Sequence, residues 1–215
     1  MDDKKSSLVV FDLDKTLLDA DCEFTWCTLL VKQELVGIEF LDRVAHYFIE
    51  YEEGTIDYVA YESYLINQMK GLSRQQLHKL LDAFLEELTP LVRPLVIQRM
   101  ERHKAQGNTI LLATSTNSVL AVPIAQSLGI ENLVCTEVEM SAGVPTGNLF
   151  GPPAFGSNKV KKVKEWVSEH TVTLEGSWFY SDSYNDLPLL EMVQNPVAVT
   201  PDARLRKHAL EHGWE

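Results

Sequence analysis

Short apolar runs that end at polar residues recur along the chain and predict the strands of a sheet. Residues 8–11 form a continuous apolar run with two valines that ends at Asp12, as expected for a buried strand of a parallel sheet. Later runs of the same kind predict four more strands, at 109–113, 133–138, 177–180 and 196–199.

Helical patterns lie between these runs. Residues 94–106 end at Gly107, residues 119–128 end at Gly129, and a charged helix is predicted over 159–170. The alternation of strand and helix predicts an α/β fold, a doubly wound and mostly parallel sheet. Ligands of such sheets bind beyond the carboxyl ends of the strands.

Residues 21–88 interrupt this alternation, because they contain helix-like segments and no convincing strand. We therefore predict a core domain made of residues 1–20 and 89–215, with a helical domain inserted at 21–88. Within the insert, Ser73 and Gln76 have the spacing of a capping box. The turn-rich stretch 140–151 indicates a hairpin or an irregular loop, and the tail 202–215 indicates a polar helix.

Charge and composition limit the partners of this chain. Its 215 residues are 45% hydrophobic and carry a formal net charge of -12, so the overall field repels nucleic acid and anionic membranes. A small phosphate ester can still bind where a metal ion and a lysine make the site locally positive.

The N-terminal apolar run is too short for a signal-peptide core or a membrane span, so a cytoplasmic location is expected. Cys22, Cys27 and Cys135 lack CxxC spacing and predict reduced, structural thiols. The sequence leaves open whether the protein is a monomer or a homodimer.

Two carboxylates follow the first predicted strand at a spacing of two residues. In an extended backbone, Asp12 and Asp14 point the same way and can face one cleft. Paired carboxylates bind a hard cation such as Mg²⁺ through oxygen, and the cation suppresses their mutual repulsion.

The segment FDLDKT, residues 11–16, resembles the first motif of the haloacid dehalogenase superfamily of aspartate-nucleophile phosphatases. Three further segments resemble the later motifs of this superfamily and occur in the same order. The resemblance spans nearly the whole chain and implies a Rossmann-like core.

The second and third motifs of the superfamily bind the phosphoryl group. The resemblance assigns the hydroxyl of the second motif to Thr114, with the adjacent Ser115 left open, and the lysine of the third motif to Lys159. A solvated basic helix face is the alternative interpretation for Lys159, because Lys161, Lys162 and Lys164 lie nearby.

The fourth motif is the apolar run that ends at Asp182, followed by Asp186. The resemblance implies a magnesium site formed by Asp12, Asp14 and Asp182. It gives Asp186 a supporting role, either as a ligand through water or as a partner of Lys159.

The resemblance also implies a reaction. Asp12 attacks the phosphoryl group and forms an aspartyl phosphate, while Asp14 first protonates the leaving group and then activates water. The insert corresponds to a helical cap that closes over the substrate and sets specificity.

The substrate class is a narrower expectation. The chain is most similar to the phosphoserine phosphatase-like branch, with some similarity to bacterial histidinol-phosphate phosphatases. In that branch an acidic residue binds the substrate's ammonium group, which makes Asp21 a candidate and Glu23 a second one. Alternatively, Asp21 caps a helix.

The insert is rich in aromatic residues, which either stack on the substrate or form the core of the insert. They are Trp26, Tyr47, Phe48, Tyr51, Tyr58, Tyr61 and Tyr64.

Two other functions remain compatible with these motifs. A phosphotransferase would use the same aspartyl phosphate and pass it to an acceptor alcohol. A catalytically silent binding or regulatory protein on the same scaffold is the other alternative.

Overall fold

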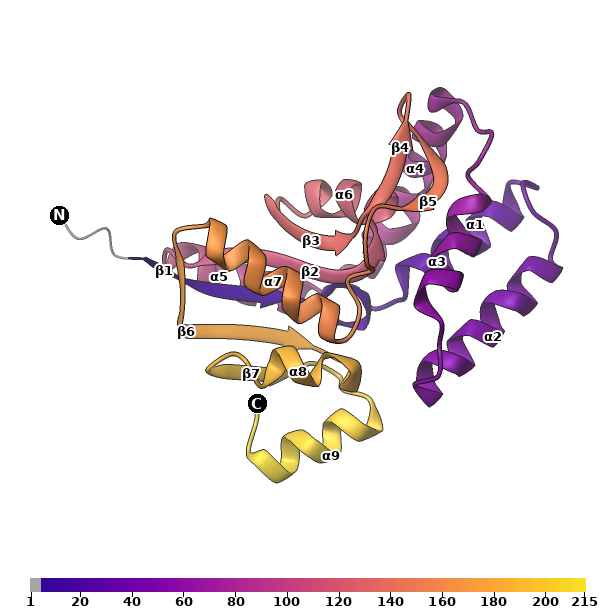
Figure 1. The fold of residues 1–215 in the computed structure, drawn as a ribbon. Coiled ribbons are helices and arrows are strands. Elements are labelled where there is room, and N and C mark those ends of the chain that lie inside the picture. The colour runs from indigo at the N-terminus through magenta and orange to yellow at the C-terminus, as the bar shows by residue number, and fades with distance from the viewer. Residues whose placement is uncertain (1–4) are drawn as a thin grey trace.

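The core of the protein is a parallel sheet of five strands in the order β3-β2-β1-β6-β7 (Figure 1). The computed structural model describes residues 5–215. The strands are β1 (Ser6–Phe11), β2 (Thr109–Asn117), β3 (Asn132–Thr136), β6 (Val172–Ser181) and β7 (Asn195–Ala198). The predicted α/β class with a mostly parallel sheet is confirmed.

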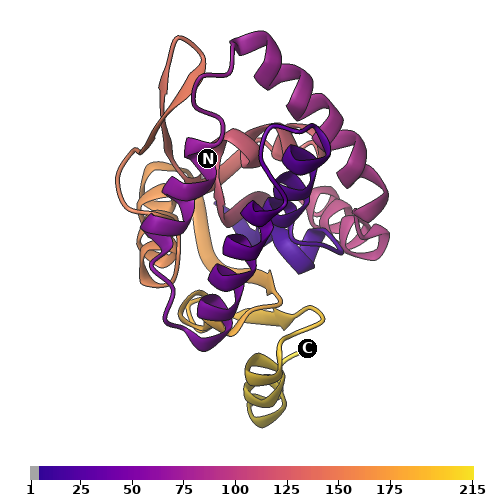
Figure 2. The same ribbon diagram turned by 90° about the vertical axis from the view of Figure 1, so that its right-hand side faces the viewer.

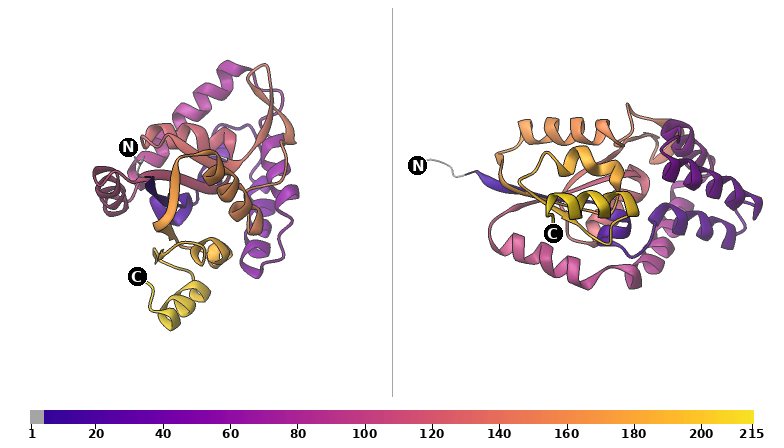
Figure 3. Two further views of the ribbon diagram at one scale, coloured as in Figure 1. Left: turned by 60° about the vertical axis from the view of Figure 1, so that its left-hand side comes forward. Right: turned by 90° about the horizontal axis from the view of Figure 1, so that it is seen from below.

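Helices cover both faces of the sheet (Figure 3). Val9 and Phe11 of β1 pack with residues of α5 and α6, whereas Leu8 and Val10 pack with residues of α7, α8 and α9. This alternation follows from the two-residue period of a strand. The bounds of these helices are α5 (Pro94–Ala105), α6 (Ser118–Ser127), α7 (Ser157–Glu169), α8 (Leu187–Leu190) and α9 (Ala203–His212).

A group of helices lies beyond the carboxyl ends of the strands (Figures 1 and 2). Its members are α1 (Cys22–Lys32), α2 (Glu39–Glu53), α3 (Tyr58–Asn67) and α4 (Arg74–Leu88). The capping box predicted at the start of α4 is present, since Ser73 and Gln76 each hydrogen-bond the other's backbone nitrogen. Asp21 and Asp57 cap α1 and α3.

Part of this helical group packs in the same hydrophobic core as the sheet. Trp26 of α1 and Phe84 of α4 belong to the same hydrophobic cluster as Phe11 of β1. A separate cluster, which includes Phe40, Tyr47 and other residues, joins α2 to α3. The predicted boundaries of a cap at 21–88 therefore remain a proposal, because α1 and α4 share the main core.

The stretch after β3 is a hairpin of β4 (Val138–Ser141) and β5 (Val144–Leu149), in agreement with one of the two predicted alternatives. It leans on the helical group at Gly147, where an added Cβ would lie 2.7 Å from the side-chain oxygen of Asn67. Gly147 also has φ +100°, which other residues rarely adopt. The predicted strand 133–138 is thus divided, because the chain turns after Thr136 into the hairpin.

Among the described residues, no helix combines the length and apolar character that a bilayer crossing requires.

Candidate active site

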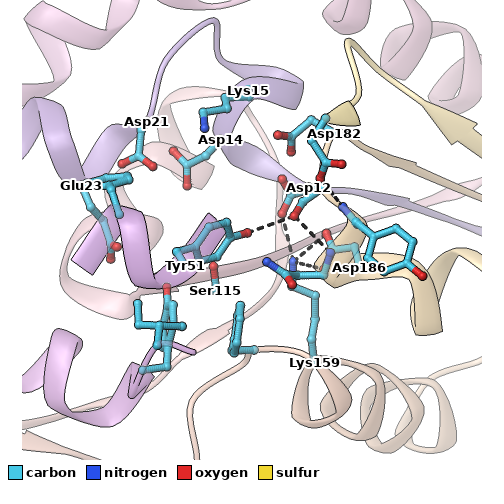
Figure 4. A pocket seen from close by; sticks show the side chains of 18 of the residues that line it. Asp12, Asp14, Lys15, Asp21, Glu23, Tyr51, Ser115, Lys159, Asp182 and Asp186 are labelled. Atoms are coloured by element: carbon cyan, nitrogen blue, oxygen red, sulfur yellow. Dashed lines mark hydrogen bonds and ion pairs between the residues drawn. The ribbon is translucent and has the colours of Figure 1, made fainter. Parts of the chain in front are cut away.

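A cavity of about 360 Å³ lies at the carboxyl ends of β1, β2 and β6, under the helical group (Figure 4). Nearly all of the predicted site residues line it: Asp12, Asp14, Asp21, Glu23, Ser115, Lys159, Asp182 and Asp186. Residues far apart in the chain thereby share one space, since Asp12 and Asp186, which are 174 positions apart, both border it. The site forms where parallel strands end together.

Asp12 directly follows β1, and its backbone nitrogen donates a 2.9 Å hydrogen bond to the carbonyl of Tyr180 in β6. Its Oδ1 lies 3.0 Å from Nζ of Lys159. Burial raises the pKa of Asp12 to about 6, against the lowering effect of Lys159. Asp12 is therefore an ionised carboxylate near neutral pH, with one oxygen held by an ammonium group.

Asp14 has different partners. Its Oδ1 accepts a 2.6 Å hydrogen bond from the backbone nitrogen of Cys22, and its Oδ2 accepts one of 2.9 Å from the Thr116 hydroxyl. Burial, followed by the charge of Asp21, raises the pKa of Asp14 well above its usual range. Burial raises the pKa of both carboxyl groups, but only Asp12 has an ammonium group beside it, so Asp14 is the one suited to carry a proton.

Lys159 lies in the first turn of α7, and its side chain is only 4% exposed. Its Nζ is 3.0 Å from Asp12 Oδ1 and 2.7 Å from Asp186 Oδ1. Burial alone would lower the pKa of Lys159, but the charges of Asp12 and Asp186 outweigh it and raise the pKa. Lys161 and Lys164 are exposed, so the solvated basic face does not include Lys159.

Asp182 and Asp186 follow β6. Burial, then the charges of Asp12 and Asp186, raise the pKa of Asp182 to about 8. Asp186 accepts hydrogen bonds from Lys159 at 3.0 Å and from the Ser181 hydroxyl at 2.8 Å. Of the two roles left open for Asp186, the structure shows the contact with Lys159.

Of the two hydroxyls left open by the sequence, the preferred Thr114 does not border the cavity, whereas Ser115 does. The Thr114 hydroxyl is buried, donates to Thr116 Oγ1 at 3.0 Å and accepts from the Thr116 nitrogen at 3.1 Å. Ser115 lines the cavity.

The helix-capping interpretation of Asp21 is confirmed, and its binding of a substrate ammonium group stays a prediction. It caps α1 by accepting a 2.9 Å hydrogen bond from the Phe24 nitrogen, and it also lines the cavity. Glu23 lines the cavity as well, and its Oε1 accepts from Nδ2 of Asn117 at 3.1 Å.

Aromatic side chains form much of the cavity wall. They are Tyr47, Phe48, Tyr51, Tyr58 and Tyr61 of the helical group, with Phe155 from the core. Tyr51 also bonds across to Ser183, with 3.0 Å between the two hydroxyl oxygens. By contrast, Trp26 packs edge-to-face on Phe84 in the main core.

The predicted metal ligands are only partly brought together. In the part of the chain that the structure describes, three or more His, Cys, Asp or Glu side chains do not converge in a way that would hold a metal ion. Asp14 is bound to Cys22 and Thr116, and Asp186 is bound to Lys159. Asp12 and Asp182 remain, and their mutual repulsion means that a divalent cation would fit the charge between them.

Sequence reasoning missed Thr116, Asn117 and Glu62, whose polar atoms hold Asp14 and Glu23 in place or extend the acidic end of the cavity. Of these three, only Thr116 and Asn117 lie in a segment that the sequence marks, the hydroxyl-rich end of β2. Nothing in the sequence around Glu62 points to the site.

Comparison with known proteins agrees with the geometry. A family profile described as haloacid dehalogenase-like hydrolase matches residues 9–191. A histidinol-phosphatase of Neisseria meningitidis serogroup C is 34% identical over 214 residues, which cover 97% of this chain and 96% of that protein.

Solved structures show the same architecture. A protein of unknown function from Bordetella pertussis Tohama I superposes with a TM-score of 0.90 at 31% identity, over 99% of this chain and 98% of that chain. A substrate-bound phosphoserine phosphatase superposes with a TM-score of 0.72 at 16% identity, over 95% and 91% of the two chains. The latter likeness concerns the fold alone.

Proposed function

The chain belongs to the haloacid dehalogenase-like hydrolase family and is a phosphatase. We propose that it hydrolyses a small phosphate monoester through an aspartyl phosphate on Asp12. The observation that carries the proposal is the contrast between two neighbouring carboxyl groups. Asp12 is held beside Lys159, whereas Asp14, whose pKa burial raises well above its usual range, lies beside two neutral donors.

In the first proposed step, an oxygen of Asp12 attacks phosphorus and the bond from phosphorus to the ester oxygen breaks. Asp14 transfers its proton to the departing alkoxide. Lys159 and the Ser115 hydroxyl hold the phosphoryl oxygens, and Lys159 keeps Asp12 ionised and oriented.

In the second step, Asp14 takes a proton from water, and the resulting hydroxide attacks the phosphorus of the aspartyl phosphate. The bond from phosphorus to Asp12 breaks, which releases inorganic phosphate and restores both carboxyl groups. Asp14 thus ends the cycle protonated, as it began.

We propose Mg²⁺ as the cofactor, held by Asp12 and Asp182. When bound, it would supply positive charge to the phosphoryl oxygens. The chain's own residues support a cation at this position, because the charge of Asp12 raises the pKa of Asp182 and the Lys159 ammonium group is already shared between Asp12 and Asp186.

The acidic residues Asp21 and Glu23 favour an amino-bearing ester such as histidinol phosphate or a phosphoserine-like compound. In this account α1 to α4 act as a cap that excludes water from the cavity. On sequence grounds we also propose a cytoplasmic location and a monomeric or homodimeric state.

A panel of phosphate monoesters, assayed for released phosphate with Mg²⁺ and with EDTA, tests the proposal. We expect phosphate release that depends on Mg²⁺ and needs no added alcohol. A phosphotransferase is the second candidate, since it would use the same Asp12. Product that forms only when an acceptor alcohol is present would favour it.

A further inference from the structure

Two glutamates from different helices meet at the end of the cavity that lies against α1 and α3. Glu23 lies in the first turn of α1 and borders the cavity, with 5% of the residue exposed. Glu62 lies in α3 and is fully buried behind it. Neither residue takes part in the phosphoryl chemistry described above.

A single amide group serves both carboxyl groups. Nδ2 of Asn117 donates to Glu23 Oε1 at 3.1 Å and to Glu62 Oε2 at 3.2 Å, and the Asn117 backbone nitrogen donates to Glu23 at 3.3 Å. Oε1 of Glu62 and Oδ1 of Asn117 are buried without a hydrogen-bond partner. The carboxyl groups of Glu23 and Glu62 also hydrogen-bond each other, so one shared proton satisfies part of this pair and leaves it with a net negative charge.

No cation balances the pair within the described residues, because neither glutamate occurs in an ion pair there. Lys159 is held by Asp12 and Asp186, while Lys15 and Arg204 are exposed at the rim of the cavity. Asp21 differs from the pair, because the charge of Lys15 acts on it.

The surroundings suit a cation from a ligand. Tyr58 and Tyr61 also line the cavity, with their ring centroids 5.6 Å apart, and Tyr58 stacks on Phe155. Aromatic rings attract ammonium groups. Burial raises the pKa of Glu62 to about 8, and burial followed by the charge of Glu62 raises the pKa of Glu23 well above its usual range. A cationic nitrogen of the ligand would favour the ionised form of both carboxyl groups.

We propose that Glu23 and Glu62 form an anionic station that binds a cationic nitrogen of the ester's organic group and disfavours a carboxylate at the same place. Glu23 contacts the ligand, and Glu62 is a positioning residue that acts through Glu23. The inference rests on the proposed phosphatase function and narrows its substrates to phosphate esters with a positively charged, carboxylate-free organic group.

Equilibrium binding tests the station without any turnover, if it is measured by calorimetry in an Asp12→Asn background. The probes are phosphoethanolamine and histidinol phosphate, which are cationic and lack a carboxylate, with phosphoserine and glycerol phosphate for comparison. Glu62→Gln is the test variant, because glutamine keeps the shape and can still accept from Asn117. Glu53→Gln, which removes an exposed acid at the end of α2, is the matched control.

We expect the protein to bind the cationic esters at least about tenfold more tightly than phosphoserine. Glu62→Gln should lower the affinity for the cationic esters about tenfold and leave the affinity for glycerol phosphate unchanged. Equal weakening of all four ligands, no weakening of any, or tight binding of phosphoserine would overturn the station. In the chain with Asp12 intact, kcat/KM should change in parallel, mainly through KM. Absence of hydrolysis with this binding pattern preserved would contradict the proposed reaction and leave the station supported.

Discussion

The hydroxyl of Thr116 donates a 2.9 Å hydrogen bond to Oδ2 of Asp14, across 102 positions of the sequence. Thr116 in turn accepts from Thr114, so two buried threonines orient the carboxyl group that we propose as the general acid. The helical group also contributes, because the backbone nitrogen of Cys22, the first residue of α1, donates to the other oxygen of Asp14.

Thr116→Val tests this arrangement. The substitution removes a hydrogen bond that stabilises the ionised form of Asp14, so the pKa of Asp14 should rise further and kcat should fall by about tenfold. A pH profile of kcat measures both effects. Thr116→Ser retains the hydroxyl and should restore most of the activity; if both variants behave alike, the hydrogen bond is not what orients Asp14.

Ser115→Ala should lower kcat/KM by roughly 100-fold, as expected when one donor to a transferring group is lost. Thr114→Ser should have little effect, because serine keeps the hydroxyl that bonds to Thr116. Steady-state kinetics of the two variants compares them directly. Near-normal activity of Ser115→Ala would mean that a hydroxyl group other than that of Ser115 binds the phosphoryl group.

Lys159→Gln should abolish measurable turnover and destabilise the fold by about 3 kcal/mol or more, because Asp12 and Asp186 would be left buried without their cation. Lys161→Gln, on the exposed face of the same helix, is the control and should change neither property. Denaturant unfolding and phosphate release measure the two quantities. Loss of activity with full stability would mean that the buried ion pair contributes nothing to folding.

Glu62 predicts the pH dependence of stability. Burial raises its pKa in the folded protein to about 8 from 4.5, so the folded state holds the proton more tightly than the unfolded chain. Its contribution to stability is therefore fully present below pH 4.5 and is lost as pH rises through about 8. Glu62→Gln should equal the parent protein near pH 5 and melt at a higher temperature near pH 9. A constant difference in melting temperature from pH 5 to 9 would contradict this assignment.

The sequence predicted the strands and carboxylates that depend on local pattern. Asp12 and Asp182 each follow an apolar run, and such runs form buried strands whose ends meet at one edge of the sheet. The start of β6 at Val172 was missed, because the Glu175–Gly176 interruption resembles a turn. In the structure Gly176 has φ +69° within the strand, beside a shift in register between β1 and β6.

The contacts that the sequence did not predict are long-range. The pairing of Glu62 with Asn117 spans 55 positions and that of Glu23 with Asn117 spans 94. Both depend on how α1 and α3 pack over the end of β2, which no local pattern determines. The choice between Thr114 and Ser115 similarly required the direction in which each side chain leaves the strand.

The central claim is that Asp12 becomes phosphorylated during turnover. A rapid acid quench of the enzyme with a hydrolysed monoester and Mg²⁺, followed by peptide mass spectrometry, measures this directly. The peptide containing Asp12 should gain the mass of one phosphoryl group, the label should disappear on the timescale of turnover, and Asp12→Asn should carry none. A phosphoryl group on a different side chain, or steady turnover by Asp12→Asn, would contradict it.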